Sequence, residues 1–270
     1  MFNDHKYLWF TDTHLDNSFL LQKYFFFKEI KKENPKGIFL TGDISTGKKV
    51  VKDLESLAKH IDCPIYFILG NHDYYHSSFC QKHNEIKALC RKYTNLHWLT
   101  QHNCFPLTEE SCVLGTEGWY DCHFGEPEFT RFTFDWFMID ELYSLPTHQD
   151  RIEYFKYLAE ESCQIIERQL TFALENYKTI YLLTHFPPWA EATRDIGTLL
   201  EPFWLPYNVN YRLGKKIEQL MSGRKKKKLI CLAGHTHTSN MVHVSRNIEC
   251  IVHEASYTRP SKSEQRIFIR

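Results

Sequence analysis

The sequence IYFILGNHD, residues 65–73, passes from a run of apolar side chains to a group of polar ones. The run Ile65–Leu69 has the length and composition of a buried strand. Gly70 lets the backbone turn sharply after this strand, which puts Asn71, His72 and Asp73 at the edge of the predicted sheet. An asparagine in a loop usually caps a turn, but this one stands among side chains that can bind metal ions.

The same succession of an apolar run and a short polar motif recurs along the chain. The motifs are Asp12-Thr13-His14, Gly42-Asp43, Gly70-Asn71-His72-Asp73, Thr184-His185 and Gly234-His235-Thr236-His237. Each follows an apolar run that predicts a buried strand. One strand edge is therefore expected to collect two carboxylates, an amide and five imidazoles.

The spacing within two of these motifs suits a shared ligand. In a strand, residues i and i+2 point to the same face, so Asp12 and His14 are expected to bind one ion from a single strand end. His235 and His237 are expected to do the same. Each motif alone can also be a capped turn with a surface histidine, but five such interpretations together are improbable. Carboxylate oxygens and imidazole nitrogens without a thiolate fit Mn²⁺, Fe or Zn²⁺ better than Ca²⁺.

The apolar runs alternate with helical patterns, which predicts an α/β architecture. Short strands are expected at Tyr7–Phe10, Gly37–Leu40, Ile65–Leu69, Cys112–Leu114, Thr179–Leu183, Leu229–Ala233, Ile248–Val252 and Ile267–Ile269. Apolar residues at helical spacing lie in 50–61, 166–174 and 213–221, and Gly223 is a plausible helix stop. The runs after residue 240 follow one another closely and are expected to be partly antiparallel.

Bulk composition indicates a folded chain without a strong global charge. The 270 residues are 43% hydrophobic and 24% charged, with Lys+Arg and Asp+Glu equal at 33 each, so no overall field attracts nucleic acid or an anionic membrane. Nine cysteines without a CxxC pair favour a reduced compartment. No signal peptide is recognisable, and no segment approaches the ~18 apolar residues of a spanning helix. A cytoplasmic location is expected.

Residues 116–160 interrupt the regular pattern. Twelve aromatic residues lie between Trp119 and Tyr157, together with an excess of acidic side chains. We expect one domain over residues 1–270, with this stretch as an aromatic, acidic insertion packed over the core. Most of its rings are expected to pack. Trp119, Tyr120 and His123 are the candidates for lining a substrate pocket, and Tyr74, Tyr75 and His76 are candidates through their proximity to the Gly70–Asp73 turn.

The five motifs resemble, in order, the signature of the calcineurin-like metallophosphoesterase superfamily: D-x-H, G-D, G-N-H-[DE], H and G-H-x-H. The resemblance covers Asp12 to His237, which is most of the chain. It implies a four-layer αββα sandwich, in which two mixed β-sheets pack face to face and are flanked by helices. It also implies a hydrolase for a small phosphomonoester or phosphodiester, with a nucleotide among the candidate substrates.

The resemblance further implies a role for each motif residue. The ligands of two divalent metal ions would be Asp12, His14 and His237 for one ion, Asn71, His185 and His235 for the other, and Asp43 between them. Two cations about 3.5–4 Å apart acidify a bridging water, so that a hydroxide attacks the phosphorus directly. His72 would face the substrate and protonate the leaving oxygen, whereas a structural role is favoured for Asp73.

Two alternatives to a small-molecule phosphoesterase remain open at this stage. A nuclease of the same superfamily would need a basic track for the nucleic-acid backbone, and the only strong basic run, Arg224–Lys228, lies at a helix end where cations suit the helix dipole. A non-catalytic metal-binding scaffold would typically have lost ligands, and none is lost here. Departures from the serine/threonine phosphatase pattern, such as Leu15 after His14, argue against that branch. The oligomeric state is not predicted.

Overall fold

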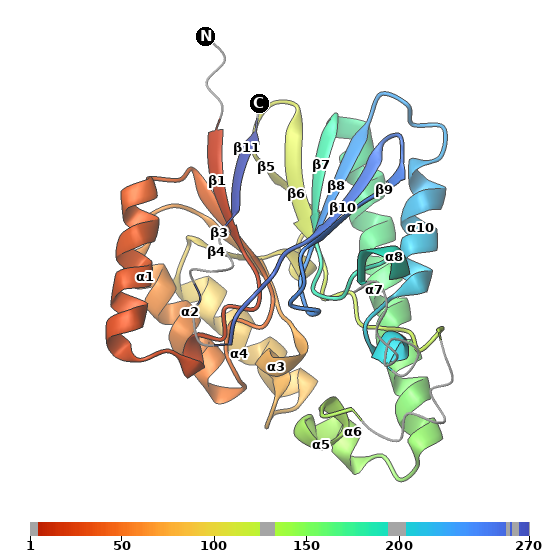
Figure 1. Ribbon diagram of the computed structural model, residues 1–270, viewed down its shortest axis with the longest axis horizontal. Coiled ribbons are helices and arrows are strands. Elements are labelled where there is room, and N and C mark those ends of the chain that lie inside the picture. Colours follow the sequence, from red (N-terminus) through yellow and green to blue (C-terminus); the bar gives the residue numbers. More distant parts are fainter. Residues whose placement is uncertain (1–4, 125–132, 194–203, 258–259, 261–264, 270) are drawn as a thin grey trace.

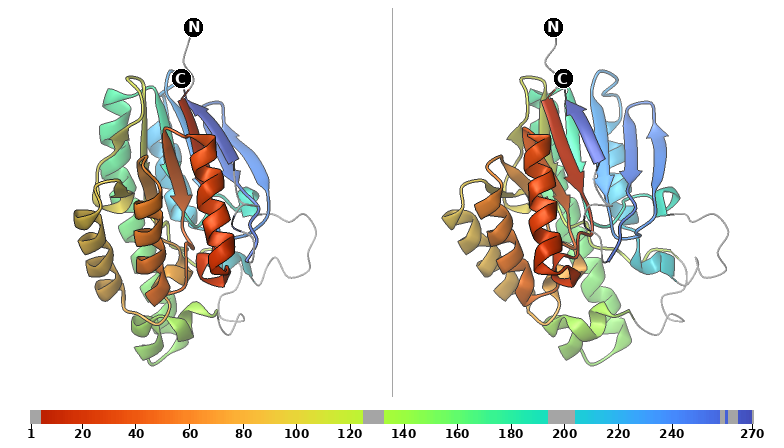
Figure 2. Two further views of the ribbon diagram at one scale, coloured as in Figure 1. Left: turned by 90° about the vertical axis from the view of Figure 1, so that its left-hand side faces the viewer. Right: turned by 60° about the vertical axis from the view of Figure 1, so that its left-hand side comes forward.

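The computed structural model describes residues 5–124, 133–193, 204–257, 260 and 265–269. Two β-sheets pack face to face, and helices cover the outer face of each sheet (Figures 1 and 2). This is the four-layer αββα sandwich with two mixed sheets that the sequence predicts. No helix among the described residues is long and apolar enough to cross a bilayer.

The first sheet has five strands in the order β11-β1-β2-β3-β4. Its strands are β1 (His5–Phe10), β2 (Gly37–Thr41), β3 (Ile65–Ile68), β4 (Leu96–Trp98) and β11 (Gln265–Ile269). Strands β1 to β4 are parallel, and β11 pairs antiparallel with β1 at one edge. The parallel strands therefore end at the same side of the sheet.

The second sheet has six strands in the order β5-β6-β7-β8-β10-β9. Its strands are β5 (Phe105–Pro106), β6 (Ser111–Gly115), β7 (Thr179–Leu183), β8 (Lys228–Ala233), β9 (Asn240–Ser245) and β10 (Ile248–Val252). The four central strands β6, β7, β8 and β10 are parallel, and the two edge strands are antiparallel to their neighbours. The expected antiparallel pairing after residue 240 is the β9–β10 hairpin.

Alternation along the strands divides the apolar side chains between two faces. In β1, Tyr7 and Trp9 belong to the cluster between the sheets, whereas Leu8 and Phe10 belong to the cluster under the helices. Successive side chains of a strand point to opposite faces, and both faces of a parallel sheet are covered. This explains why the strands read as continuous apolar runs and not as alternating ones.

The described helices are α1 (Leu20–Glu33), α2 (Lys48–His60), α3 (Asn71–Tyr74), α4 (Phe79–Lys92), α5 (Asp135–Met138), α6 (Asp140–Ser144), α7 (His148–Asn176), α8 (Ala190–Thr193) and α10 (Tyr211–Met221). The long ones form two outer layers, whereas α3, α5 and α6 lie at the ends of the strands (Figure 1). Helices α1, α2 and α4 cover the first sheet, and α7 and α10 cover the second. Gly223, with φ of +73°, follows the end of α10, as expected for a helix stop.

The described parts of the aromatic stretch, residues 116–124 and 133–160, pack against the rest of the fold. Trp119, Trp136 and Phe155 share one core cluster with residues of β1, β2 and β3. The long helix α7 continues through residue 160 without a break, and the side chain of Thr147 caps it by accepting from the backbone nitrogen of Asp150. The lower part of α7, with α5 and α6, extends past the strand ends toward α3 (Figure 1).

Candidate metal centre

The candidate ligands lie in loops at the carboxyl ends of parallel strands from both sheets. Asp12 and His14 follow β1, Asp43 follows β2, Asn71 begins α3 after β3, His185 follows β7, and His235 and His237 follow β8. Ligand sites of open α/β sheets form at these strand ends. The chain therefore brings these side chains to the place where the ends of the two sheets meet.

The geometry of these loops differs from the expectation of strand alternation. Strand β1 ends at Phe10 and β8 at Ala233, so neither Asp12 and His14 nor His235 and His237 lie in a strand. These four residues and Asp43 have left-handed backbone conformations with φ between 40° and 70°. Such conformations cost of order 1–3 kcal/mol each and collect at functional sites. These side chains therefore converge through strained loops after β1, β2 and β8, and not through the alternation of side chains within a strand.

The first group of candidate ligands contains Asp12, His14 and His237. His237 Nε2 lies 3.2 Å from Asp12 Oδ1 and 3.4 Å from His14 Nε2. His14 Nε2 is 3.9 Å from Asp43 Oδ2. The ligand atoms of Asp12, His14 and His237 all lie within 4.8 Å of one another, which is close enough for one ion to contact all three.

The second group contains Asn71 and His185, again with Asp43 beside them. His185 Nε2 lies 3.0 Å from Asn71 Oδ1 and 3.5 Å from Asp43 Oδ1. His185 Nδ1 lies 2.9 Å from the carbonyl oxygen of Thr41. Because a carbonyl can only accept, the proton of a neutral His185 is on Nδ1, and its Nε2 carries a lone pair. Three acceptor atoms thus face one another, an arrangement that a cation between them stabilises.

His235 lies beside this second group. The centroid of its ring is 5.2 Å from that of His185, and its Nε2 is 2.9 Å from Asn208 Oδ1. If Nε2 donates to Asn208, the lone pair of the neutral ring is on Nδ1. The backbone nitrogen of His235 donates to the carboxylate of Asp12. This backbone hydrogen bond ties the loop after β8 to the loop after β1.

The buried imidazoles of this centre are unprotonated at neutral pH, so they can bind a cation. Burial lowers the pKa of His14 and of His185 to about 3, and that of His235 to about 4, so these rings are neutral at pH 7. Burial, the carboxylate of Asp12 and that of Asp73 raise the pKa of Asp43 well above its ordinary value. The donor set therefore lacks positive charge, which divalent cations would supply. The residues present fit a dinuclear metal site.

Hydrogen bonds from the backbone hold the loop ligands in place. The backbone nitrogen of His72 donates to Asp43 Oδ1 over 2.9 Å, and that of His14 donates to the carbonyl oxygen of Asp43 over 3.0 Å. Asp73 accepts from the backbone nitrogens of Gly70 and Ser45, each over 2.9 Å. Asp73 thus joins the loops after β2 and β3.

The metal centre opens into a cleft of about 390 Å³. Its lining includes Asn71, His72 and His235 from the motifs and, around them, Tyr75, Thr133, Phe134, Asp135, Trp204, Tyr207, Asn208 and Tyr257. His72 is well placed for chemistry in this cleft, because its Nε2 is 3.9 Å from Asp43 Oδ2 and 26% of its side chain is exposed. Burial lowers the pKa of His72 below its ordinary value.

The residues suggested from sequence as substrate contacts mostly lie elsewhere. Trp119, Tyr120 and Tyr74 are buried in the core, His123 stacks on Tyr211, and none of these or His76 lines the cleft. The large rings of Trp119, Tyr120 and Tyr74 lie in the core because burial of their apolar area stabilises the fold. Among these candidates only Tyr75 reaches the cleft.

Several residues of the cleft were missed by reasoning from sequence, and Asp135 and Tyr257 are two of them that contact candidate ligands. The buried carboxylate of Asp135 accepts a hydrogen bond from Asn71 Nδ2 over 2.8 Å. The ring of Tyr257 lies with its centroid 4.5 Å from those of both His14 and His237. Neither residue belongs to a motif. No sequence signal distinguishes Asp135 from the other acidic residues of its stretch, or Tyr257 from other tyrosines.

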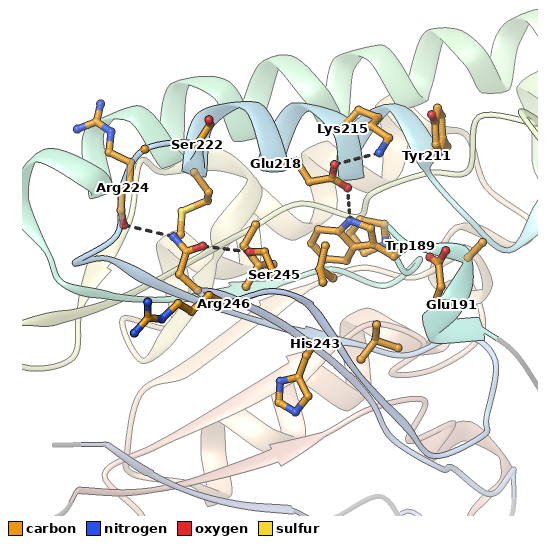
Figure 3. A pocket seen from close by; sticks show the side chains of 18 of the residues that line it. Trp189, Glu191, Tyr211, Lys215, Glu218, Ser222, Arg224, His243, Ser245 and Arg246 are labelled. Carbon is orange, nitrogen blue, oxygen red and sulfur yellow. Dashed lines mark hydrogen bonds and ion pairs between the residues drawn. The ribbon is translucent and has the colours of Figure 1, made fainter.

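A larger hollow of about 970 Å³ lies between α10 and β9 (Figure 3). Trp189, Glu218 and Val244 are among its lining residues, and Trp189 Nε1 donates to Glu218 Oε1 over 3.0 Å. Arg224 and Lys225, from the basic run, line one end of it. None of the candidate ligands lines this hollow. The smaller cleft, which Asn71 and His235 line, is therefore the candidate active site.

The four-layer fold and the paired clusters of carboxylates and imidazoles define a metal-dependent phosphoesterase. The chain belongs to the calcineurin-like phosphoesterase family, whose sequence model matches residues 5–239. It is accordingly a phosphate-ester hydrolase, and family and geometry together fit two metal ions. A sequence search of curated proteins found no match.

Solved structures show the same fold at low sequence identity. The phosphopantetheinyl hydrolase of Mycobacterium tuberculosis is 12% identical with a TM-score of 0.67, and the match covers 98% of this chain and 96% of that one. A dimetal phosphatase from Danio rerio is 13% identical with a TM-score of 0.61, and the match covers 98% and 92% of the two chains. Identities this low establish the shared fold alone.

Proposed function

We propose that this chain hydrolyses a small phosphomonoester or phosphodiester at a centre of two divalent cations, which are Mn, Fe or Zn. The observation that carries the proposal is the meeting of acceptor atoms from both sheets. His185 Nε2 lies 3.0 Å from Asn71 Oδ1 and 3.5 Å from Asp43 Oδ1. These atoms repel one another unless positive charge lies between them.

The ligand assignment follows the two groups. Asp12, His14 and His237 would hold one cation, Asn71, His185 and His235 would hold the other, and Asp43 would contact both. When bound, two divalent cations neutralise phosphate oxygens and lower the pKa of water. Left-handed backbone at Asp12, His14, Asp43, His235 and His237 orients five of these seven ligands.

His72 is assigned to the leaving group. It lies beside the ligands but faces the cleft, with its ring centroid 4.4 Å from that of Tyr75 and 4.9 Å from that of His14. Packing against these two rings restricts the orientation of the imidazole. A proton held on the ring nitrogen that faces the substrate can pass to the departing oxygen, which contributes about 10²–10⁴ to the rate.

The wall of the cleft supports a small substrate with a planar group, such as a nucleotide. The volume of about 390 Å³ is at the small end of the range for small-molecule sites. Phe134, Trp204 and Tyr257 line it while remaining 71%, 46% and 50% exposed. Exposed rings of this size offer flat surfaces for stacking. Among the described residues no lysine or arginine lines the cleft, which does not favour a nucleic-acid substrate.

A substrate panel tests the proposal. Protein loaded separately with Mn²⁺, Fe²⁺ or Zn²⁺ is assayed on an aryl phosphate, a bis-aryl phosphate, nucleoside monophosphates, cyclic nucleotides, single-stranded oligonucleotide and supercoiled plasmid. We expect turnover of small esters that D43A abolishes and that H72A lowers by about 10²–10⁴. The matched control is H243A, because His243 is exposed on β9 and pairs with Glu249. Full activity in both D43A and H72A would refute the assignment, and preferential plasmid cleavage would indicate the nuclease.

A further inference from the structure

Asp135 is a buried acid at the start of α5, inside the aromatic stretch that follows β6. Only 3% of it is exposed. Its Oδ1 accepts from Asn71 Nδ2 and from the hydroxyl of Tyr75, each over 2.8 Å. Its Oδ2 accepts from the hydroxyl of Tyr120 over 2.9 Å. All three donors are themselves buried, so the carboxylate is held in one orientation by a closed set of hydrogen bonds.

Of the three hydrogen-bond donors to Asp135, Asn71 is the one that is also a candidate metal ligand. An asparagine amide presents an oxygen on one side and an NH₂ group on the other, and the two ends have nearly the same shape. Here the NH₂ group donates to Asp135 Oδ1 and to the hydroxyl oxygen of Tyr75, which is 3.1 Å away. The oxygen therefore faces His185 Nε2 at 3.0 Å.

The reversed amide would be unfavourable beside a carboxylate. Rotation by 180° would place Asn71 Oδ1 against Asp135 Oδ1, and two acceptors would then meet in a buried site. It would also present NH₂ to the position beside His185, and the lone pair of an amide nitrogen is delocalised and binds metal ions poorly. The negative charge of Asp135 strengthens its preference for the donor end of the amide.

We infer that Asp135 is a positioning residue that fixes Asn71 Oδ1 toward the second cation; the inference rests on the proposed dinuclear function. Asp135 acts through Asn71, whose NH₂ group donates to its carboxylate. The aromatic stretch thereby gains a role that the sequence leaves open, because it supplies the residue that supports a ligand from the loop after β3. Groups that orient metal ligands commonly contribute 10–100-fold to metal affinity.

Metal binding measured site by site tests the inference. Apoprotein of the wild type, D135A and D135N is titrated with Mn²⁺ by calorimetry, and bound Mn²⁺ is counted after equilibrium dialysis. Electron paramagnetic resonance distinguishes a spin-coupled Mn²⁺ pair from isolated Mn²⁺. In D135A we expect the second Mn²⁺ to bind 10–100-fold more weakly while the first changes less than about threefold. The coupled signal is replaced by that of isolated Mn²⁺ at limiting metal.

Two variants separate positioning from a general effect on folding. D135N keeps the shape and one acceptor oxygen, so it is expected to fold and to show a smaller loss at the second position. Y120F removes a donor to the far oxygen of Asp135 without touching Asn71, so it is expected to keep both Mn²⁺ ions. Thermal unfolding of each apoprotein reports whether the fold is retained.

The outcomes are distinct. If D135A and D135N bind two Mn²⁺ with wild-type affinities and keep the coupled signal, the inference is overturned while the proposed function stands. Equal weakening of both positions, or the same loss in Y120F as in D135N, also overturns it, because Asp135 would then support the fold and not the ligand. If the wild type itself binds fewer than two Mn²⁺ ions, the dinuclear function fails and the inference with it.

Discussion

His237 Nε2 lies 3.2 Å from Asp12 Oδ1, and this contact joins the loop after β8 of one sheet to the loop after β1 of the other. Asp12 is fully buried, and it also accepts from the backbone nitrogen of His235. The two sheets are therefore linked at their carboxyl ends by groups that are also candidate metal ligands. Binding of a cation here is coupled to the stability of the whole sandwich.

Metal removal is accordingly expected to lower thermal stability. A ligand present at a hundredfold excess over its Kd stabilises the native state by about 2.7 kcal/mol per site, which corresponds to roughly 5–10 °C in a domain of this size. Differential scanning calorimetry of EDTA-treated protein with and without Mn²⁺ measures the shift. D12N should lose most of it. An identical Tm for the wild type in EDTA and in Mn²⁺ would contradict the prediction.

Replacement of His72 should slow the reaction without emptying the metal centre. H72Q is expected to lower kcat by about 10²–10⁴ because the leaving oxygen loses its proton donor. Bound Mn²⁺, counted by elemental analysis, should stay at the wild-type value. The loss should be larger for an alkyl leaving group than for an aryl one, because an aryl oxide departs without much help from an acid. Equal losses for both leaving groups would exclude the role of proton donor.

Gly234 is a position where a single methyl group should disrupt the metal centre. A Cβ there would overlap with Thr11 Oγ1 and Asp12 Oδ2, so G234A must displace the Asp12 carboxylate. We expect at least a tenfold loss of Mn²⁺ affinity, measured by calorimetry. The control is G223A, where φ is +73° but nothing lies within 4 Å of the added Cβ. It should cost about 1–2 kcal/mol of stability and leave Mn²⁺ binding unchanged.

The sequence predicted most of the strands of this fold because central parallel strands such as β2, β3 and β6 are buried on both faces. Continuous apolar runs such as Tyr7–Phe10 and Thr179–Leu183 mark the parallel strands directly. The candidate ligands could be named because each follows such a run, and parallel strands end at a common edge. The prediction of the loop conformations was wrong. It extended the alternation of a strand to Asp12 and His14, but β1 ends before these residues.

The sequence did not predict which residues outside the motifs line the cleft or contact a ligand, and the reason is a different one. Trp119 and Trp204 have the same side chain, yet Trp119 is 4% exposed in the core and Trp204 is 46% exposed in the cleft wall. Composition alone does not distinguish these two positions. Asp135 contacts Asn71 across 64 positions of sequence, and no local pattern encodes such a pairing. Its role depends on how the aromatic stretch packs.

Gln169 on α7 offers a test of the packing that supports the second sheet. Its Nε2 contacts the carbonyl oxygens of Leu99, His102 and Gly115 at 2.9, 2.7 and 3.2 Å, and the residue is fully buried. Q169M leaves these carbonyls without their donor and should cost about 3 kcal/mol of unfolding free energy. Q164M, at an exposed position of the same helix, should change stability by less than about 0.5 kcal/mol. Urea unfolding of the apoprotein measures both, and equal costs would show that the Nε2 contacts do not matter.

His83 should make the stability of the fold depend on pH. Burial, with a smaller effect of Lys87, lowers its pKa from 6.5 to about 4 in the folded chain, and its Nε2 lies 3.1 Å from the hydroxyl of Tyr74. Between pH 6.5 and about 4 the unfolded chain binds this proton and the folded chain does not. Stability therefore falls as the pH falls through this window, by about 1.4 kcal/mol per pH unit for one proton, and the loss ends below about pH 4.

The contribution of His83 can be isolated from that of the other buried histidines. H83Q is neutral throughout the window, so its unfolding free energy should fall less than that of the wild type between pH 7 and pH 5, by about 2 kcal/mol. Urea unfolding in EDTA at both values measures the two differences, and EDTA removes the separate effect of protons on metal binding. His60, which is exposed at the last position of α2, supplies the control: H60Q should follow the wild type. If H83Q and the wild type lose equal stability over this interval, His83 is not the group that stays unprotonated in the folded chain.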